Sequence, residues 1–228
     1  MTKRIFIALG LAAALLFGYL ATDASNQQRL TNTFNRIYAE GTWGRDVAGK
    51  GISGTGSTLE ITREYRAYVE DFLKTHAVKS VVDAGCGDWS FSRAINWGEA
   101  SYLGVDIASD VIAAVRNKHE SGKIKFQVGD ISGDLPAADL LISKDVLQHL
   151  SNDLVHKFIR NNLRTGKYKW VILTNDRGSK NNDVASGGYR AIDLAAPPFD
   201  VRGLVDLPIK FGNEVTKITS LLDLTQQP

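Results

Sequence analysis

The chain has 228 residues, of which 43% are apolar and 23% are charged, and its formal net charge at pH 7 is +2. These values are ordinary for a soluble globular domain, and the lack of a long basic run or a nucleic-acid-binding motif argues against a nucleic-acid partner. One cysteine and four histidines, without Cys-x-x-Cys or His-x-x-x-His spacing, argue against a metal site.

The first 24 residues have the pattern of a membrane anchor or a signal segment. Lys3 and Arg4 precede an uncharged, mostly apolar run of 18 residues, from Ile5 to Thr22. This run is just long enough to span a bilayer and rather long for the apolar core of a signal peptide. Small residues at positions 22–24 keep a cleaved signal as the alternative. We expect a single uncleaved anchor and therefore membrane association, with Lys3 and Arg4 on the cytoplasmic side.

Residues 25–57 separate this segment from the main domain, residues 58–228. Apolar residues recur at helical spacing over 27–39, and a glycine-rich stretch follows at 49–57. Such composition is usual in a flexible linker. Tyr38 and Trp43, however, would be costly to leave in a linker.

The main domain begins with a helix. Ser57-Thr58-Leu59-Glu60 is a capping-box pattern, and it predicts a helix from Thr58 to about His76. The size of the segment fits one α/β domain.

A strand then runs into a glycine-rich turn, over the sequence Val81-Val82-Asp83-Ala84-Gly85-Cys86-Gly87-Asp88-Trp89. Gly85 and Gly87 allow the backbone to turn tightly and to approach a ligand closely. A pyrophosphate site uses backbone N–H groups and a helix N-terminus at this place. Asp83 adds a carboxylate instead, which suits a ligand with a cationic end.

The next two predicted strands also end in acids. Residues 101–106 end at Asp106, 21 positions after Gly85, which is the spacing of the acid that binds ribose hydroxyls in a βαβ unit. Dinucleotide-binding enzymes share this acid, so Asp106 does not discriminate between cofactors. Residues 125–131 form an alternating strand that reaches Asp130 and Ile131.

A fourth strand, residues 139–143, leads into Lys144-Asp145-Val146-Leu147-Gln148-His149-Leu150. Ligands of open α/β sheets lie outside the carboxyl ends of the strands. If this stretch is helical, Asp145 and His149 share one face. A histidine near neutral pH can accept a proton, and the alternative is a structural histidine bonded to backbone.

The remaining sequence completes a sheet. Residues 170–174 are a fifth strand, and residues 203–210 and 215–224 form a closing pair. The polar stretch at 177–190 is long enough to be functional rather than a plain connection.

These motifs resemble those of the class I S-adenosylmethionine-dependent methyltransferases. Asp83-x-Gly85-x-Gly87 resembles motif I of that family, with Trp89 where a third glycine is usual. Asp130 and Ile131 match the positions that bind the adenine amino group and cover its ring. Residues 143–149 resemble the Ser-Arg-Asp-x-x-x-His stretch of phosphoethanolamine-type and other small-molecule methyltransferases, with a lysine in place of the arginine.

The resemblance implies a Rossmann-like α/β fold with a seven-stranded mixed sheet, helices on both faces and the strand order 3-2-1-4-5-7-6. It also implies that residues 25–57 form a lid over the cofactor, S-adenosylmethionine. The implied cofactor contacts are Asp83, Gly85, Cys86, Gly87, Trp89, Asp106, Ile107, Asp130, Ile131 and Lys144. Asp145 would help to hold the substrate, and His149 would serve in acid/base chemistry.

The leading hypothesis is therefore methyl transfer to an oxygen or nitrogen atom of a small polar molecule. One alternative is an NAD(P)-dependent oxidoreductase, against which Asp83 and Asp130 argue. Another is a non-catalytic cofactor-binding domain held at a membrane. Because S-adenosylmethionine is made in the cytoplasm, the orientation expected for the anchor conflicts with this cofactor, and the side of the membrane stays open.

Overall fold

The computed structural model describes residues 24–225. The apolar run at 5–22 lies outside these residues. Within residues 24–225, no helix is both long enough and apolar enough to cross a bilayer.

Seven strands form one mixed sheet in the order β3-β2-β1-β4-β5-β7-β6, which confirms the predicted order. Only β7 runs antiparallel to its neighbours β5 and β6. The strands are β1 (Ser80–Ala84), β2 (Ser101–Asp106), β3 (Ile124–Val128), β4 (Leu140–Lys144), β5 (Trp170–Asp176), β6 (Leu204–Leu207) and β7 (Lys217–Asp223). Strand β4 is buried along its whole length, and its apolar residues Leu140, Leu141 and Ile142 are typical of a central strand covered on both faces.

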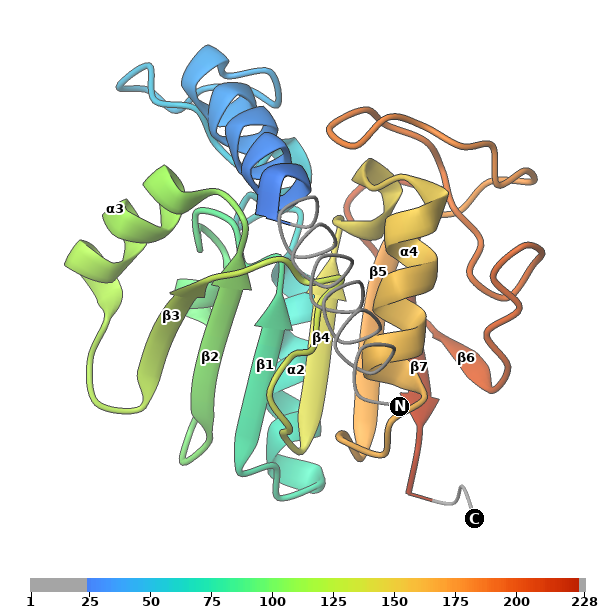
Figure 1. Cartoon of the computed structure of the whole chain (residues 1–228). Coiled ribbons are helices and arrows are strands. Elements are labelled where there is room, and N and C mark those ends of the chain that lie inside the picture. Colours follow the sequence, from blue (N-terminus) through green and yellow to red (C-terminus); the bar gives the residue numbers. More distant parts are fainter. Residues whose placement is uncertain (1–23, 226–228) are drawn as a thin grey trace, which may run out of the picture.

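Helices cover both faces of the sheet (Figure 1). They are α2 (Arg63–Thr75), α3 (Ser109–His119) and α4 (Asn152–Phe158), which continues as a π-helical turn over Ile159–Leu163. Helix α2 presents Tyr65, Val69 and Phe72 to the core at helical spacing. It begins five residues later than predicted, because the Thr62 hydroxyl donates to the Thr58 carbonyl (2.7 Å) and closes a separate turn.

Residues 24–40 form a further helix, which lies across the carboxyl ends of the strands (Figure 1). Phe34, Ile37 and Tyr38 of this helix are buried in the same core as the sheet. The segment before the main domain therefore packs on it and does not behave as a free linker.

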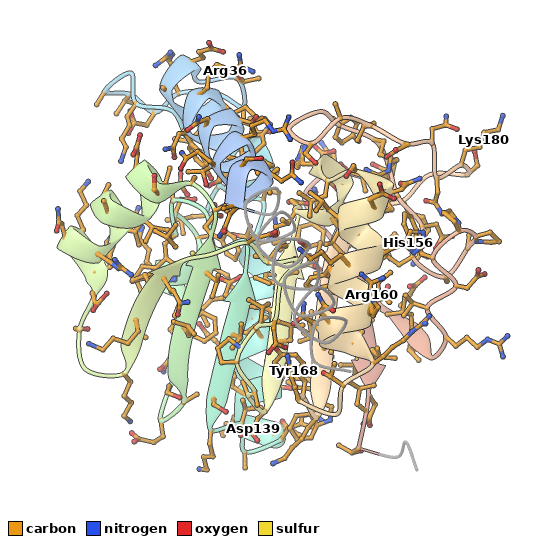
Figure 2. All side chains as sticks on the ribbon, viewed as in Figure 1. Arg36, Asp139, His156, Arg160, Tyr168 and Lys180 are labelled. Atoms are coloured by element: carbon orange, nitrogen blue, oxygen red, sulfur yellow. The ribbon has the colours of Figure 1, made fainter. Side chains whose placement is uncertain are left out.

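The amino ends of the strands carry charged side chains that pair locally. Asp139, at the opposite end of the sheet from Arg36 (Figure 2), accepts a hydrogen bond from the Lys79 backbone (2.7 Å) and pairs with Lys169 (2.8 Å). These contacts join loops at the end of the sheet opposite the carboxyl ends of its central strands.

Candidate active site

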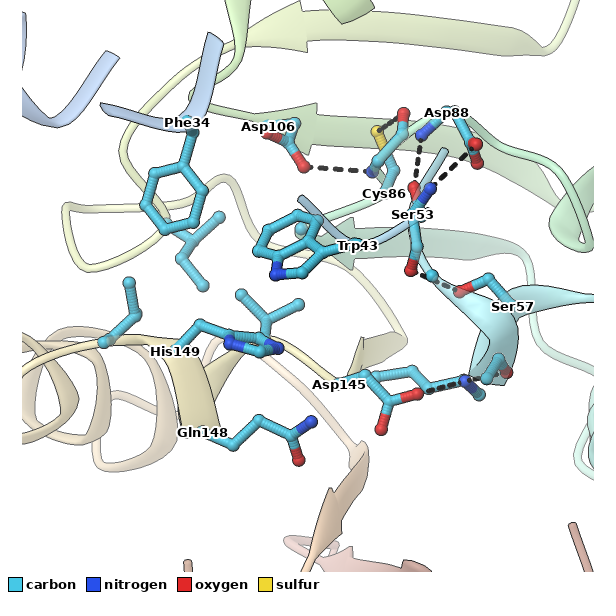
Figure 3. Close-up of a pocket in the computed structure, with 18 of the residues that line it drawn as sticks. Phe34, Trp43, Ser53, Ser57, Cys86, Asp88, Asp106, Asp145, Gln148 and His149 are labelled. Atoms are coloured by element: carbon cyan, nitrogen blue, oxygen red, sulfur yellow. Dashed lines mark hydrogen bonds and ion pairs between the residues drawn. The ribbon is translucent and has the colours of Figure 1, made fainter. Parts of the chain in front are cut away.

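A cavity of about 320 Å³ lies at the carboxyl ends of the central strands. Its walls come from the helix at 24–40, from residues 53–57, from the turn after β1, and from the segments after β2, β3, β4 and β5. Figure 3 shows several of these side chains converging from both sides of the cavity. A volume of this size is at the low end of the range for small-molecule sites.

The turn after β1 requires glycine at two positions. Gly85 has φ +89° and Gly87 has φ +55°. A Cβ atom on Gly85 would lie 2.3 Å from the Val146 side chain, and one on Gly87 would lie 2.4 Å from the Ser53 hydroxyl. The turn is thus fixed both by its backbone conformation and by its close neighbours.

Ser53 fastens the segment at 53–57 to this turn. Its backbone N–H donates to the Asp88 carboxylate (3.0 Å), and its hydroxyl accepts from the Asp88 backbone N–H (3.0 Å). Further along the segment, the Ser90 hydroxyl donates to the Ser57 carbonyl (3.0 Å). Residues 53–57 therefore form one wall of the cavity. The hydrogen bonds between Ser53 and Asp88 that fasten this wall were not predicted from the sequence.

Asp83 is buried at the end of β1 and lines the cavity. Burial raises the pKa of Asp83 to about 7, although the Tyr102 hydroxyl, which donates to it at 2.6 Å, acts in the opposite direction. A cation bound nearby would favour the charged form of this carboxyl group.

Asp106 and Asp130 also line the cavity at the ends of their strands. The Asp106 carboxylate accepts hydrogen bonds from the backbone N–H groups of Gly87 and Ala108, each at 2.9 Å. Asp130 accepts from the Ser132 backbone N–H (2.8 Å) and hydroxyl (2.9 Å). Each carboxylate oxygen has two lone pairs, so these acids can still accept bonds from a ligand. The predicted contacts Cys86, Ile107 and Ile131 lie in the same wall.

Trp89 is not where the sequence places it. Its side chain is buried away from the cavity and packs against Phe126 (5.1 Å between ring centroids), Tyr102 (5.7 Å) and His119 (5.0 Å). The left-handed backbone at Trp89, φ +57°, turns the indole into the core. The side chain of Trp89, which the sequence predicts as a cofactor contact, therefore lies outside the cavity wall and packs the domain.

Lys144, Asp145 and Lys217 form a buried charge cluster at the end of β4. Asp145 Oδ2 pairs with Lys144 Nζ and its Oδ1 pairs with Lys217 Nζ, both at 2.5 Å. The side chains of Lys144, Asp145 and Lys217 are 3%, 14% and 6% exposed. Burial raises the pKa of Asp145, but the two ammonium groups outweigh it and hold the pKa below its usual value. Lys144 also donates to the Gly56 carbonyl (2.9 Å), so the cluster holds residues 53–57.

This geometry corrects the expected relation of Asp145 to His149. Strand β4 continues to Lys144, Asp145 has φ +58°, and a 3-10 turn covers Leu147–His149. The two residues therefore do not share a helix face. Both still line the cavity, and Asp145 faces the lysines.

His149 has a defined tautomer. Its Nδ1 lies 2.7 Å from the Gly188 carbonyl, which only accepts hydrogen bonds, so Nδ1 carries the proton and Nε2 is left as an acceptor. Burial lowers the pKa of His149, so the imidazole is neutral near pH 7. The predicted functional loop at 177–190 thus contributes by orienting this ring, and its Tyr189 lines the cavity.

Comparisons with known proteins agree with this architecture. Residues 81–167 match the family model described as a methyltransferase domain. The N-methyltransferase NodS from Bradyrhizobium japonicum WM9, solved with S-adenosyl-L-homocysteine, superposes with a TM-score of 0.55 at 13% identity, over 72% of this chain and 87% of that chain. The methyltransferase domain of bacterial CtHen1-CN gives 0.54 at 12% identity, over 72% and 100% of the two chains. No curated protein matches the sequence.

The match to a methyltransferase domain thus covers residues 81–167, and the fold of the chain is that of the solved methyltransferases NodS and CtHen1-CN. Two features of the cavity suit S-adenosylmethionine, the cofactor that the sequence resemblance implies. The two-glycine turn forms a cradle that any Cβ atom would fill. Carboxylates at the ends of β1, β2 and β3 suit a ligand that carries an ammonium, a sulfonium and a ribose diol. Asp106 and Asp130 would hold the adenosine, and Ile107 and Ile131 would pack beside it.

Replacing Asp106 by alanine should weaken binding of S-adenosylhomocysteine by about 1.5–3 kcal/mol, or roughly 10- to 150-fold, because bonds to a charged group are lost. Titration calorimetry measures the change. Asp71→Ala is the matched control, since Asp71 is exposed on α2 outside the cavity. Equal affinities of wild type and Asp106→Ala would remove Asp106 from the cofactor site.

Proposed function

We propose that the protein transfers the methyl group of S-adenosylmethionine to an oxygen or nitrogen atom of a small polar molecule. The observation that carries the proposal is the single cavity that holds both the Gly85–Gly87 turn and the acceptor nitrogen of His149. The bound cofactor supplies a methyl carbon activated by a positively charged sulfur.

The chain's own residues supply alignment and a base. Residues 53–57 and Trp43 cover the cavity, and His149 Nε2 can take the proton that the acceptor atom loses on methylation. Alignment of two bound reactants can lower a barrier by about 7–11 kcal/mol. The protein therefore needs to form no covalent bond with either reactant.

The segment after β1 argues against a dinucleotide cofactor. A pyrophosphate is usually bound at the N-terminus of the helix that follows the glycine turn. Here the turn leads into a short 3-10 turn, Ser92–Ala94, and the next α-helix of the described chain is α3, after β2. In the sequence, Asp83 and Asp130 also argue against a dinucleotide cofactor, so the two observations agree.

A screen for methyl transfer tests the proposal. The protein is incubated with S-adenosylmethionine labelled on its methyl group and with phosphobases, amines, phenols or sugars, and labelled products are counted. We expect one of these classes to be methylated. Saturable binding of S-adenosylhomocysteine without transfer to any class would favour the non-catalytic alternative.

We also propose that residues 1–24 hold the domain at a membrane, on the basis of the uncharged run behind Lys3 and Arg4. Full-length protein should then sediment with membranes, and protein that starts at Ser25 should stay in the supernatant. A native N-terminus at Ser25, found by sequencing the mature protein, would show a cleaved signal instead.

A further inference from the structure

The wall of the cavity is rich in carboxylates. Seven acids line it, and they are Asp83, Asp88, Asp106, Asp130, Asp145, Asp176 and Glu214. Among the described residues the same wall has two cationic side chains, Lys144 and Lys217, and no arginine. The electrostatic potential of such a cavity attracts cations and repels anions.

Both lysines are already paired. Each lysine donates to one oxygen of Asp145 at 2.5 Å. Lys217 Nζ also lies 3.5 Å from Asp176 Oδ1. A phosphate or carboxylate on the substrate would therefore have to break this buried cluster to find a counter-charge. Breaking a buried pair leaves an unpaired charge at high cost, so the cluster disfavours an anionic group in this part of the cavity.

Aromatic rings and carboxylates line the cavity together with His149. The centroid of the His149 ring lies 4.9 Å from that of Trp43 and 5.8 Å from that of Tyr189. Figure 3 shows the rings of His149 and Trp43 next to each other. The Tyr189 hydroxyl donates to Asp176 Oδ2 (3.1 Å), and Glu214 lines the same cavity. Aromatic faces with carboxylates behind them bind organic cations.

We propose that the methyl acceptor is an amine that enters as an ammonium ion, held by the Tyr189 ring and the carboxylates of Asp176 and Glu214. The inference rests on the proposed methyl transfer and names its substrate class. The ammonium passes one proton to His149 Nε2, and the freed nitrogen lone pair forms the new N–C bond. The S–C bond breaks with its electron pair kept by sulfur, which leaves a neutral thioether, a methylammonium product and a proton on His149 that returns to water.

Titration calorimetry on the full-length protein saturated with S-adenosylhomocysteine tests this assignment. The probes are phenethylammonium, 2-phenylethanol and 3-phenylpropionate, which share a ring and differ in the charge of the end group. The cavity wall includes the apolar residues Leu30, Phe34 and Leu150, which can contact the ring of each probe. We expect the ammonium to bind at least tenfold more tightly than the alcohol, and the carboxylate to bind the least.

One variant and its control test whether Glu214 causes the preference for the ammonium probe. Glu214→Gln should lower the affinity for phenethylammonium several-fold and narrow its advantage over the alcohol. Glu120→Gln is the matched control, because Glu120 pairs with Arg116 at the end of α3, outside the cavity. An unchanged preference in Glu214→Gln, equal binding of alcohol and ammonium, tighter binding of the carboxylate, or no binding of the ammonium would each overturn the inference. These results leave the proposed methyl transfer standing, whereas failure of S-adenosylhomocysteine to bind would overturn both.

Discussion

Replacing His149 by alanine should lower the rate of methyl transfer by about 10²–10⁴-fold, the usual contribution of a positioned general base. The Gly188 carbonyl fixes the proton on Nδ1, and burial lowers the pKa of the ring, so Nε2 is a free acceptor near pH 7. The rate constant at saturating substrate, measured with labelled cofactor, gives the change. Because the imidazole must be neutral to act, the rate should fall only when the pH drops below this lowered pKa.

The control for this prediction is His156→Ala. His156 lies on α4, packs against Phe199 and is not part of the cavity wall (Figure 2). Affinity for S-adenosylhomocysteine should be nearly unchanged in His149→Ala, since the cofactor acids end other strands. Turnover equal to wild type in this variant would assign His149 to structure, and catalysis would then rest on alignment alone.

Replacing Asp145 by alanine should lower the free energy of unfolding by about 3–5 kcal/mol, the cost of removing one member of a buried ion pair. The change leaves the ammonium groups of Lys144 and Lys217 buried without their shared carboxylate. From the sequence we expected this variant mainly to weaken substrate binding, and the structure adds the loss of stability. Urea unfolding followed by circular dichroism measures the difference.

A double variant separates charge from packing. Asp145→Ala combined with Lys217→Met removes one buried cation with the acid, so part of the lost stability should return. An Asp145→Ala protein as stable as wild type would mean that water solvates the two lysines and that the cluster contributes little to folding.

The first three strands could be predicted from the sequence because each is a short run with apolar residues that leads to an acid. Asp83, Asp106 and Asp130 mark the ends of the first three strands, and parallel strands bring their carboxyl ends to one edge. The order of all seven strands followed from the family resemblance that these residues carry.

The partners that complete the cavity could not be predicted, because they are far apart along the chain. Lys217 meets Asp145 across 72 positions, and Ser53 meets Asp88 across 35. The burial of a lysine on a strand cannot be predicted from the sequence unless the acid that pairs with it is known. The position of Trp89 was missed for a local reason, since only the left-handed backbone at that residue turns its ring into the core.

Titration of the full-length protein with S-adenosylhomocysteine and, separately, with NAD tests the assignment of the cavity most directly. The carboxylates at the ends of β1, β2 and β3 and the missing helix after the glycine turn predict saturable binding of S-adenosylhomocysteine in the micromolar range and no measurable heat with NAD. Saturable binding of NAD with no response to S-adenosylhomocysteine would contradict the account.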